Sequence, residues 1–80
     1  FKMGDYDQAI ENLEHAVALM PADSLLNEHL GDAYWRAGRR IEARFQWQRS
    51  LDHEPEDRAA LEAKMANGLP PPHETRAAHR

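Results

Sequence analysis

The sequence repeats itself at an interval of 34 residues, and this interval constrains the fold more than any other feature. The stretch GDYDQAIENLEHAVALMPAD, which begins at Gly4, returns in similar form as GRRIEARFQWQRSLDHEPED, which begins at Gly38. Small residues and turn residues recur in register: Ala9 with Ala43, Pro21 with Pro55 and Asp23 with Asp57. A fixed period of about 20–50 residues indicates supersecondary units that stack into a solenoid. The sequence therefore predicts a stack of similar units.

The first half of the complete unit, residues 24–37, predicts an amphipathic helix. Its apolar residues recur every three or four positions, so they form one stripe on a helix. They are Leu26, Leu30, Ala33, Tyr34 and Ala37. Asp23 or Ser24 can cap the start, since both side chains accept hydrogen bonds from free backbone N–H groups. Gly38 can end the helix, because glycine adopts a left-handed conformation without a Cβ clash.

The second half of the unit predicts a partner helix from Arg40 to about His53, which Pro55 ends. We expect its inward or interlayer residues to be Ile41, Phe45, Trp47, Ser50 and Leu51. The first copy shows only this second helix, over residues 6–20, and residues 1–3 should be the tail of a helix before it. The apolar stripe of the first copy is Tyr6, Ala9, Ile10, Leu13, Ala16, Val17 and Met20.

A fourth helix is predicted over residues 57–67, and Asn67-Gly68 should stop it. Leu61, Met65 and Leu69 form a narrow apolar stripe bordered by Glu62 and Lys64. This pattern is typical of a lid with one buried and one solvated face, which terminal repeats of solenoids need. The residues beyond it, PPPHETRAAHR, show no periodicity and predict a flexible tail.

The repeat resembles the tetratricopeptide repeat. The family pattern is W-x-x-L-G-x-x-Y, then A-x-x-x-F, then P, and the chain meets it at Leu30, Gly31, Tyr34, Ala43 and Pro55. Asn27 replaces the opening Trp and Trp47 replaces the Phe, while the first copy matches at Ala9, Leu13 and Pro21. The resemblance implies an all-α fold of antiparallel helix-turn-helix repeats, stacked as an α-solenoid with a C-terminal capping helix.

The resemblance also implies a division of the chain. Residues 1–22 form a partial repeat, 23–56 a complete repeat, 57–68 the capping helix, and 69–80 a flexible proline-rich tail. The chain is then the C-terminal fragment of a longer array. Gly31 and Ala43 are small where two helices must approach closely, so a bulky residue at Gly31 should disrupt the stack.

Tetratricopeptide arrays usually bind peptides or partner helices in a concave groove lined by the first helix of each repeat. Carried onto this chain, the groove would display Leu25, Glu28, Asp32, Trp35 and Arg36, joined by Lys2 and Glu62. Because Glu28 and Asp32 would repel a carboxylate ligand, the resemblance favours a basic or amphipathic protein partner. For each residue taken alone, an ordinary solvated side chain is an equally good interpretation.

Two other functions stay open on the sequence alone. The chain can be a non-catalytic accessory segment of a larger enzyme such as a transferase. It can also be a self-association module, which would use the uncovered apolar face of the first helix. That face carries Tyr6, Ile10, Leu13 and Val17.

The charge pattern disfavours nucleic acid as a partner. The net charge of -4 and the pI near 5.7 are opposite to what binding a polyanion requires. Five arginines nevertheless lie close together with Glu42 as the one acidic residue among them: Arg36, Arg39, Arg40, Arg44 and Arg49. We favour a solvated outer face whose arginines pair with acidic residues of neighbouring helices, over an anion-binding patch.

Residues for a cofactor, a metal or a reaction are not apparent. The chain has no cysteine, no Gly-rich phosphate loop and no serine in a nucleophile motif. Glu11 and His15 are four apart on one helix, but no third ligand follows at a suitable spacing. No apolar run approaches the roughly 20 residues of a membrane-spanning helix. We therefore expect no enzyme, no cofactor and no membrane insertion, and the compartment stays open.

Overall fold

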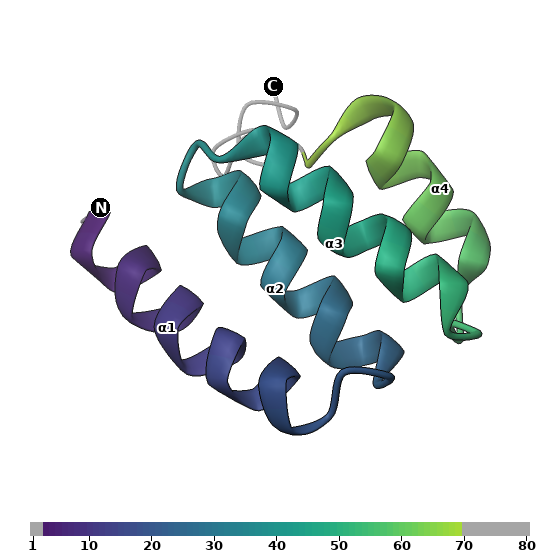
Figure 1. The fold of residues 1–80 in the computed structure, drawn as a ribbon. Coiled ribbons are helices and arrows are strands. Elements are labelled where there is room, and N and C mark those ends of the chain that lie inside the picture. Colours follow the sequence, from purple (N-terminus) through teal and green to yellow (C-terminus); the bar gives the residue numbers. More distant parts are fainter. Residues whose placement is uncertain (1–2, 70–80) are drawn as a thin grey trace.

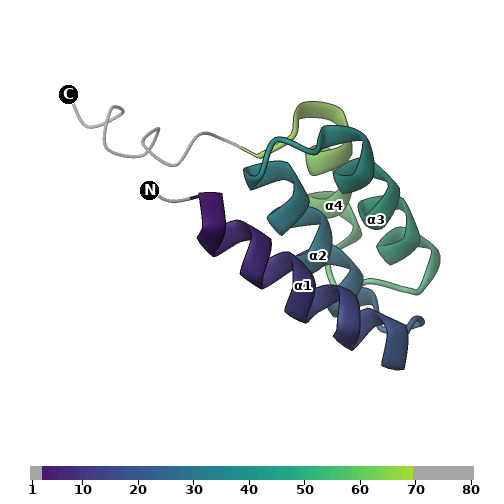
Figure 2. The ribbon, with the colours of Figure 1, turned by 60° about the vertical axis from the view of Figure 1, so that its left-hand side comes forward.

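The computed structural model describes residues 3–69, and within this range the chain forms four α-helices and no strand. They are α1 (Met3–Leu19), α2 (Ser24–Arg36), α3 (Arg40–Asp52) and α4 (Arg58–Asn67). Consecutive helices run antiparallel and lie side by side, with α2 between α1 and α3 and α4 packed on α3 (Figure 1). In the turned view, α1 lies at the front of the stack and α4 lies at the back (Figure 2). The all-α class and the helical-repeat arrangement predicted from the sequence are confirmed.

The caps of α2 and α4 come from two aspartates that are 34 residues apart. Asp23 Oδ1 accepts a hydrogen bond from the backbone N–H of Leu26 at 3.0 Å, and Asp57 Oδ1 accepts one from Ala60 at 3.0 Å. Of the two candidate caps of α2, the structure thus selects Asp23. Gly38 has a φ of +86° and lies just after the end of α2, where a residue with a Cβ would be strained.

The prediction that residues 1–3 end a separate helix is wrong for Met3, because α1 is continuous from Met3 to Leu19. In the complete repeat the chain reverses at Gly38, where α2 and α3 pack on one another. Phe1, Lys2 and residues 70–80 lie outside the described residues, so the expected Lys2 contact and nearly all of the expected tail do as well.

The core lies along α2 and α3 and receives one or more side chains from every helix. Its buried apolar residues are Ile10, Leu30, Tyr34, Ala43, Trp47, Leu51 and Leu61. Trp47 and Leu61 are wholly buried, and Met65 and Leu69 pack on the core at its edge. Leu61 therefore attaches α4 to the stack, whereas Glu62 lies at the surface, as expected of a lid.

The prediction that Ile41 and Phe45 lie inward or between layers is wrong. Ile41 is 85% exposed and Phe45 is 60% exposed. Successive residues of a helix are about 100° apart, so residues two positions from Ala43 lie on the opposite side of α3. The small Ala43 and the large Trp47 complete the buried side, which leaves these two apolar residues at the surface.

Two fully buried polar residues join the ends of α2 and α3. Ser50 Oγ donates to the Ser24 carbonyl oxygen at 2.8 Å, and Ser24 Oγ donates to the Ser50 carbonyl oxygen at 2.9 Å. Asn27 Nδ2 donates to the carbonyl oxygens of Pro21 and Asp23, at 3.0 and 2.9 Å. Because buried polar groups are costly unless hydrogen-bonded, these contacts fix how the chain enters α2.

None of the helices among residues 3–69 combines the length and apolar character needed to cross a membrane.

Candidate partner-binding surface

Glu28 and Asp32, which the sequence places in a binding groove, are bound by Lys64 of α4. Lys64 Nζ lies 2.7 Å from Glu28 Oε2 and 3.1 Å from each carboxylate oxygen of Asp32. Burial alone would lower the pKa of the Lys64 ammonium, but the hydrogen bonds to Glu28 and Asp32 raise its pKa above the ordinary lysine value. The two carboxylates therefore already hold one cation on this face of α2.

Asp32 has a second contact that lies in the core. Its Oδ1 accepts a hydrogen bond from Trp47 Nε1 at 3.0 Å, and Trp47 has no exposed surface. The indole N–H is a donor that needs a partner when it is buried. Asp32 thus links α2, α3 and α4. Its position in the sequence pattern did not predict this structural role.

Trp35 packs as part of the structure and is only half exposed to a potential partner. Its ring is stacked on Trp47 with the centroids 5.5 Å apart, and the guanidinium groups of Arg40 and Arg44 lie 4.6 and 5.2 Å from its ring centre. Gly68 adjoins its other edge so closely that a Cβ there would lie 2.1 Å from Trp35 Cζ2. Arg36 is half-buried in the last turn of α2.

Leu25 is 57% exposed and borders a hollow of about 300 Å³ at the start of α2. The hollow lies where α2 and α4 begin and α3 ends, and five of its lining residues are carboxylates. The lining is Asp23, Ser24, Leu25, Glu28, His53, Glu54, Glu56 and Asp57. We call this site the acidic hollow. Glu54 has a φ of +56°, which is uncommon for a residue with a side chain, so the loop between α3 and α4 turns sharply here.

Leu25 and Glu28 of the acidic hollow were predicted from the sequence as binding residues, whereas its other members were not. They lie on two interhelical turns, 34 residues apart. From the sequence, Asp23 and Ser24 were interpreted only as candidate caps and Asp57 only as a recurring turn residue. Their meeting follows from the repeat itself, because the turns of stacked repeats lie at the same end of a solenoid. The coincidence of Asp23 with Asp57 in the 34-residue alignment was the available signal.

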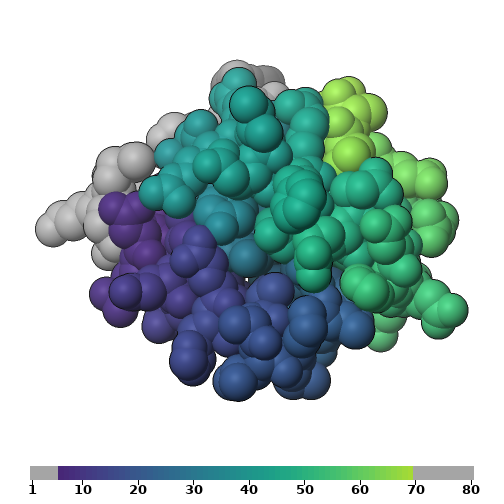
Figure 3. Space-filling view, in the orientation of Figure 1, coloured from purple at the N-terminus to yellow at the C-terminus, as the bar shows by residue number. Residues whose placement is uncertain are grey.

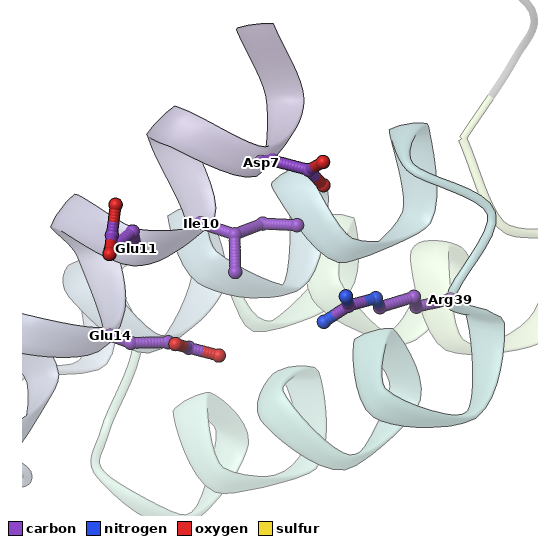
Figure 4. Close-up of a pocket in the computed structure, with 5 residues that line it drawn as sticks. All are labelled: Asp7, Ile10, Glu11, Glu14 and Arg39. Carbon is purple, nitrogen blue, oxygen red and sulfur yellow. The ribbon is translucent and has the colours of Figure 1, made fainter. Parts of the chain in front are cut away.

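A second hollow, of about 290 Å³, lies between α1 and the start of α3 (Figure 4). Asp7, Ile10, Glu11 and Glu14 line it from α1, and the Arg39 side chain extends toward them.

A hydrogen bond joins Tyr34 of α2 to Glu14 of α1. Tyr34 donates its hydroxyl proton to Glu14 Oε2 at 2.5 Å. Burial, this hydrogen bond and the charge of Glu14 raise the pKa of Tyr34 to about 12. The contact ties α1 to α2.

The expectation that the clustered arginines pair with acidic residues is wrong for Arg39, Arg40, Arg44 and Arg49. Within residues 3–69 none of these four has a carboxylate oxygen within 4.0 Å. Each guanidinium instead lies over an aromatic ring. The pairs are Arg39 over Tyr34, Arg40 and Arg44 over Trp35, and Arg49 over Phe45. The sequence showed these aromatic residues close by but gave no reason to pair them with the arginines.

Metal-binding side chains do not gather in the part of the chain that the structure describes. There, no group of three or more His, Cys, Asp or Glu residues is arranged to hold a metal ion. Glu11 and His15, the pair considered from the sequence, are both exposed on α1.

Comparison with known proteins supports one family. No curated protein and no solved structure matches the chain significantly. The family model of the tetratricopeptide repeat matches residues 1–67, which covers all four helices. Such repeats generally mediate protein–protein interactions, and domains made of them are typically non-catalytic scaffolds. The chain belongs to the tetratricopeptide repeat family.

Proposed function

We propose that the chain is a protein-interaction scaffold that binds a basic or amphipathic segment of a partner protein along α2, with the acidic hollow as the main contact. The observation that carries the proposal is the exposure of Leu25 at the rim of a hollow lined by five carboxylates. An apolar contact beside concentrated negative charge suits a segment that carries an apolar residue next to Lys or Arg.

Lys64 supports this choice of partner, because it is a basic side chain that two carboxylates of α2 already bind. Its ammonium is held between Glu28 and Asp32 with only 20% of the side chain exposed. A partner lysine approaching the acidic hollow would meet the same kind of acceptor. The preordered helices leave most of the cost of ordering to the partner segment.

The contact of Lys64 with Glu28 and Asp32 also changes which residues of α2 we propose for binding. Lys64 occupies Glu28 and Asp32, and Trp35 stacks on Trp47. The exposed binding positions are therefore Leu25 and the exposed carboxylates of the acidic hollow, Glu54, Glu56 and Asp57. Glu28 lines the acidic hollow as well as binding Lys64. The sequence-predicted set thus divides into an outer part available to a partner and an inner part that holds α4.

The test is affinity capture from source lysate, read by mass spectrometry, with three forms of the protein. They are the parent, a variant with Leu25→Ser, Glu54→Lys and Glu56→Lys, and a control with Glu11→Lys and Leu19→Ser on α1. All five changed residues are exposed, so the helices should be retained, and circular dichroism would check this. We expect a partner that the parent and the control retain and the acidic-hollow variant loses. Equal capture by all three forms would contradict the proposal.

Self-association through α1 is a second candidate, favoured by a difference between the two copies of the repeat. Trp47 and Ser50 are wholly buried, whereas their counterparts Leu13 and Ala16 are only half-buried. Burying that apolar surface against another copy would stabilise a dimer. Sedimentation velocity over a range of concentrations distinguishes the cases, since a constant monomer mass would exclude this candidate.

A further inference from the structure

The outer surface of α3 carries an exposed apolar pair between arginines. Ile41 and Phe45 are four residues apart, so their side chains lie next to each other on the helix. Residues 40–52 extend across the middle of the face seen in Figure 3, with no other helix over them. We call Arg40, Ile41, Arg44, Phe45 and Arg49 the arginine face of α3.

The charges of this face are not neutralised by carboxylates within residues 3–69. Arg44 Nε donates to the carbonyl oxygen of Met65 at 3.1 Å, and Arg49 Nε donates to Asn27 Oδ1 at 3.4 Å. Both acceptors are uncharged, and the two guanidinium groups also lie over aromatic rings, Arg44 over Trp35 and Arg49 over Phe45. Such contacts orient a guanidinium and leave its positive charge available to a carboxylate of another molecule.

Packing on aromatic rings also makes these arginines better suited to binding. A free arginine side chain loses conformational entropy when it binds a partner, and one already held over a ring loses less. Arg40 is exposed while its guanidinium lies 4.6 Å from the centre of the Trp35 ring. Arginine and aromatic residues are also the types enriched in the energetically important centres of interfaces.

We propose that the arginine face of α3 is a second interaction surface, which docks an acidic amphipathic helix of a partner protein. The apolar residues of that helix would cover Ile41 and Phe45, and its carboxylates would meet Arg40, Arg44 and Arg49. The charge requirement is opposite to that of the acidic hollow. This inference does not rest on the function proposed for α2, because it involves a different helix face.

A protein helix fits this surface better than a nucleic acid does. Ile41 and Phe45 are large apolar side chains that are 85% and 60% exposed, and apolar side chains of a partner would cover them. The 14 acidic residues against 10 basic ones would repel a long polyanion, whereas a short helix meets only the local charge. Glu42 lies beside the face and Asp52 accepts from Gln48 near its end, so the attraction is confined to the first turns of α3.

The test uses a synthetic fluorescent peptide of about four helical turns. Its leucines recur at helical spacing (i, i+3, i+4, i+7) along the whole peptide, so that they form one face of the helix, and every other residue is glutamate. Its binding to the full chain is measured by fluorescence anisotropy. A peptide of the same composition with the leucines scattered serves as the probe control, and a single-stranded oligonucleotide of similar length serves as the competitor.

Two variants of the chain address the two components of the surface separately. Ile41→Ser with Phe45→Ser removes exposed apolar area, and Arg40→Glu reverses an exposed charge. The matched control is Leu19→Ser with Met20→Ser, which removes two exposed apolar residues at the end of α1. We expect the dissociation constant of the amphipathic peptide to rise about tenfold for each α3 variant and to stay unchanged for the control.

Several outcomes would overturn the inference. These are an absence of saturable binding by the parent, equal binding of the scattered peptide, and equal loss of binding in the Leu19 and Met20 variant. Displacement of the peptide by the oligonucleotide at lower concentration than by unlabelled peptide would assign the surface to nucleic acid instead. If the serine variant loses helicity, the Arg40→Glu variant still tests the proposal. Peptide-induced changes in the amide NMR shifts of the labelled parent test it as well, because docking on α3 predicts changes concentrated in residues 40–49.

Discussion

Gly31 of α2 lies directly against the indole of Trp47, since a Cβ on Gly31 would be 2.5 Å from Trp47 Cδ1 and 3.0 Å from the Ala43 carbonyl oxygen. Trp47 is wholly buried and cannot move away without disturbing the core. We expect Gly31→Ala to lower the free energy of unfolding by about 1–3 kcal/mol, the usual cost of an overpacked core. Helix propensity alone would favour alanine by up to about 1 kcal/mol, so urea denaturation decides between the two effects.

Gly38→Ala is the matched control for this prediction. A Cβ at Gly38 would meet nothing within 4 Å, but its φ of +86° is unfavourable for alanine. The expected cost is about 1 kcal/mol, from backbone strain alone. A Gly31→Ala protein as stable as the parent would show that α2 and α3 separate readily, contrary to the packing described.

The acceptor role of Asp32 predicts unequal effects for the two carboxylates that hold Lys64. Asp32→Ala should destabilise the protein by about 1–3 kcal/mol more than Glu28→Ala does, because it leaves the buried N–H of Trp47 without a partner. Glu28 contributes to a partly exposed ion pair, whose loss typically costs no more than about 1 kcal/mol. Urea midpoints at neutral pH measure both, and equal effects would contradict the role assigned to the Asp32–Trp47 contact.

Tyr34 predicts a loss of stability in alkali. Burial of its phenol and the hydrogen bond and charge of Glu14 raise its pKa from 10.0 to about 12. The folded state therefore keeps the proton where the unfolded chain releases it, and stability falls as the pH rises from about 10 to about 12. Lys64, whose pKa is also raised, contributes in the same direction.

Tyr34→Phe isolates the tyrosine component. We expect its stability to fall less steeply than that of the parent above pH 10, because only the parent loses a tyrosine proton from this site. Urea midpoints over a pH series measure the two slopes, and Lys64 affects both proteins alike. Parallel slopes would contradict the raised pKa of Tyr34.

Asn27 occupies the position where the family pattern has Trp, and the structure predicts that restoring Trp is harmful. Asn27 is wholly buried and donates to Pro21 and Asp23 at the entry to α2. An indole there would overpack the site, at a cost of about 1–3 kcal/mol, and leave those carbonyl oxygens without their donor. Leu25→Trp adds the same ring at an exposed neighbouring position and should change stability by no more than about 0.5 kcal/mol. Thermal unfolding of both variants tests this.

The repeat interval and the helix periodicity were enough to predict the fold. Four helices, their order and their approximate ends follow from turn residues and apolar stripes, which are local signals. The faces of α3 were harder, because its apolar residues occur on both sides of the helix. Ile41 and Phe45 are as hydrophobic as the core residues, and only the packing of Ala43 and Trp47 decides which side is buried.

The candidate site could be predicted only in part, because its contacts join residues distant in sequence. Lys64 reaches Glu28 and Asp32 across 36 and 32 positions, and the acidic hollow brings together two turns. A family pattern places residues on a helix face but does not say which side chain of the next helix lies over them. Asn27, which replaces the Trp of the family pattern, forms hydrogen bonds that the pattern gives no reason to expect.

The stacked pair Trp35 and Trp47 has an optical consequence. These are the two tryptophans of the chain, one at the end of α2 and the other in α3, so indole emission reports on a single helix–helix junction. Helix α1 contains no tryptophan, and it packs on α2. We therefore expect fraying of α1 to change tryptophan emission less than it changes far-ultraviolet dichroism. A gap between the two unfolding curves would measure how independently the first helix leaves the stack.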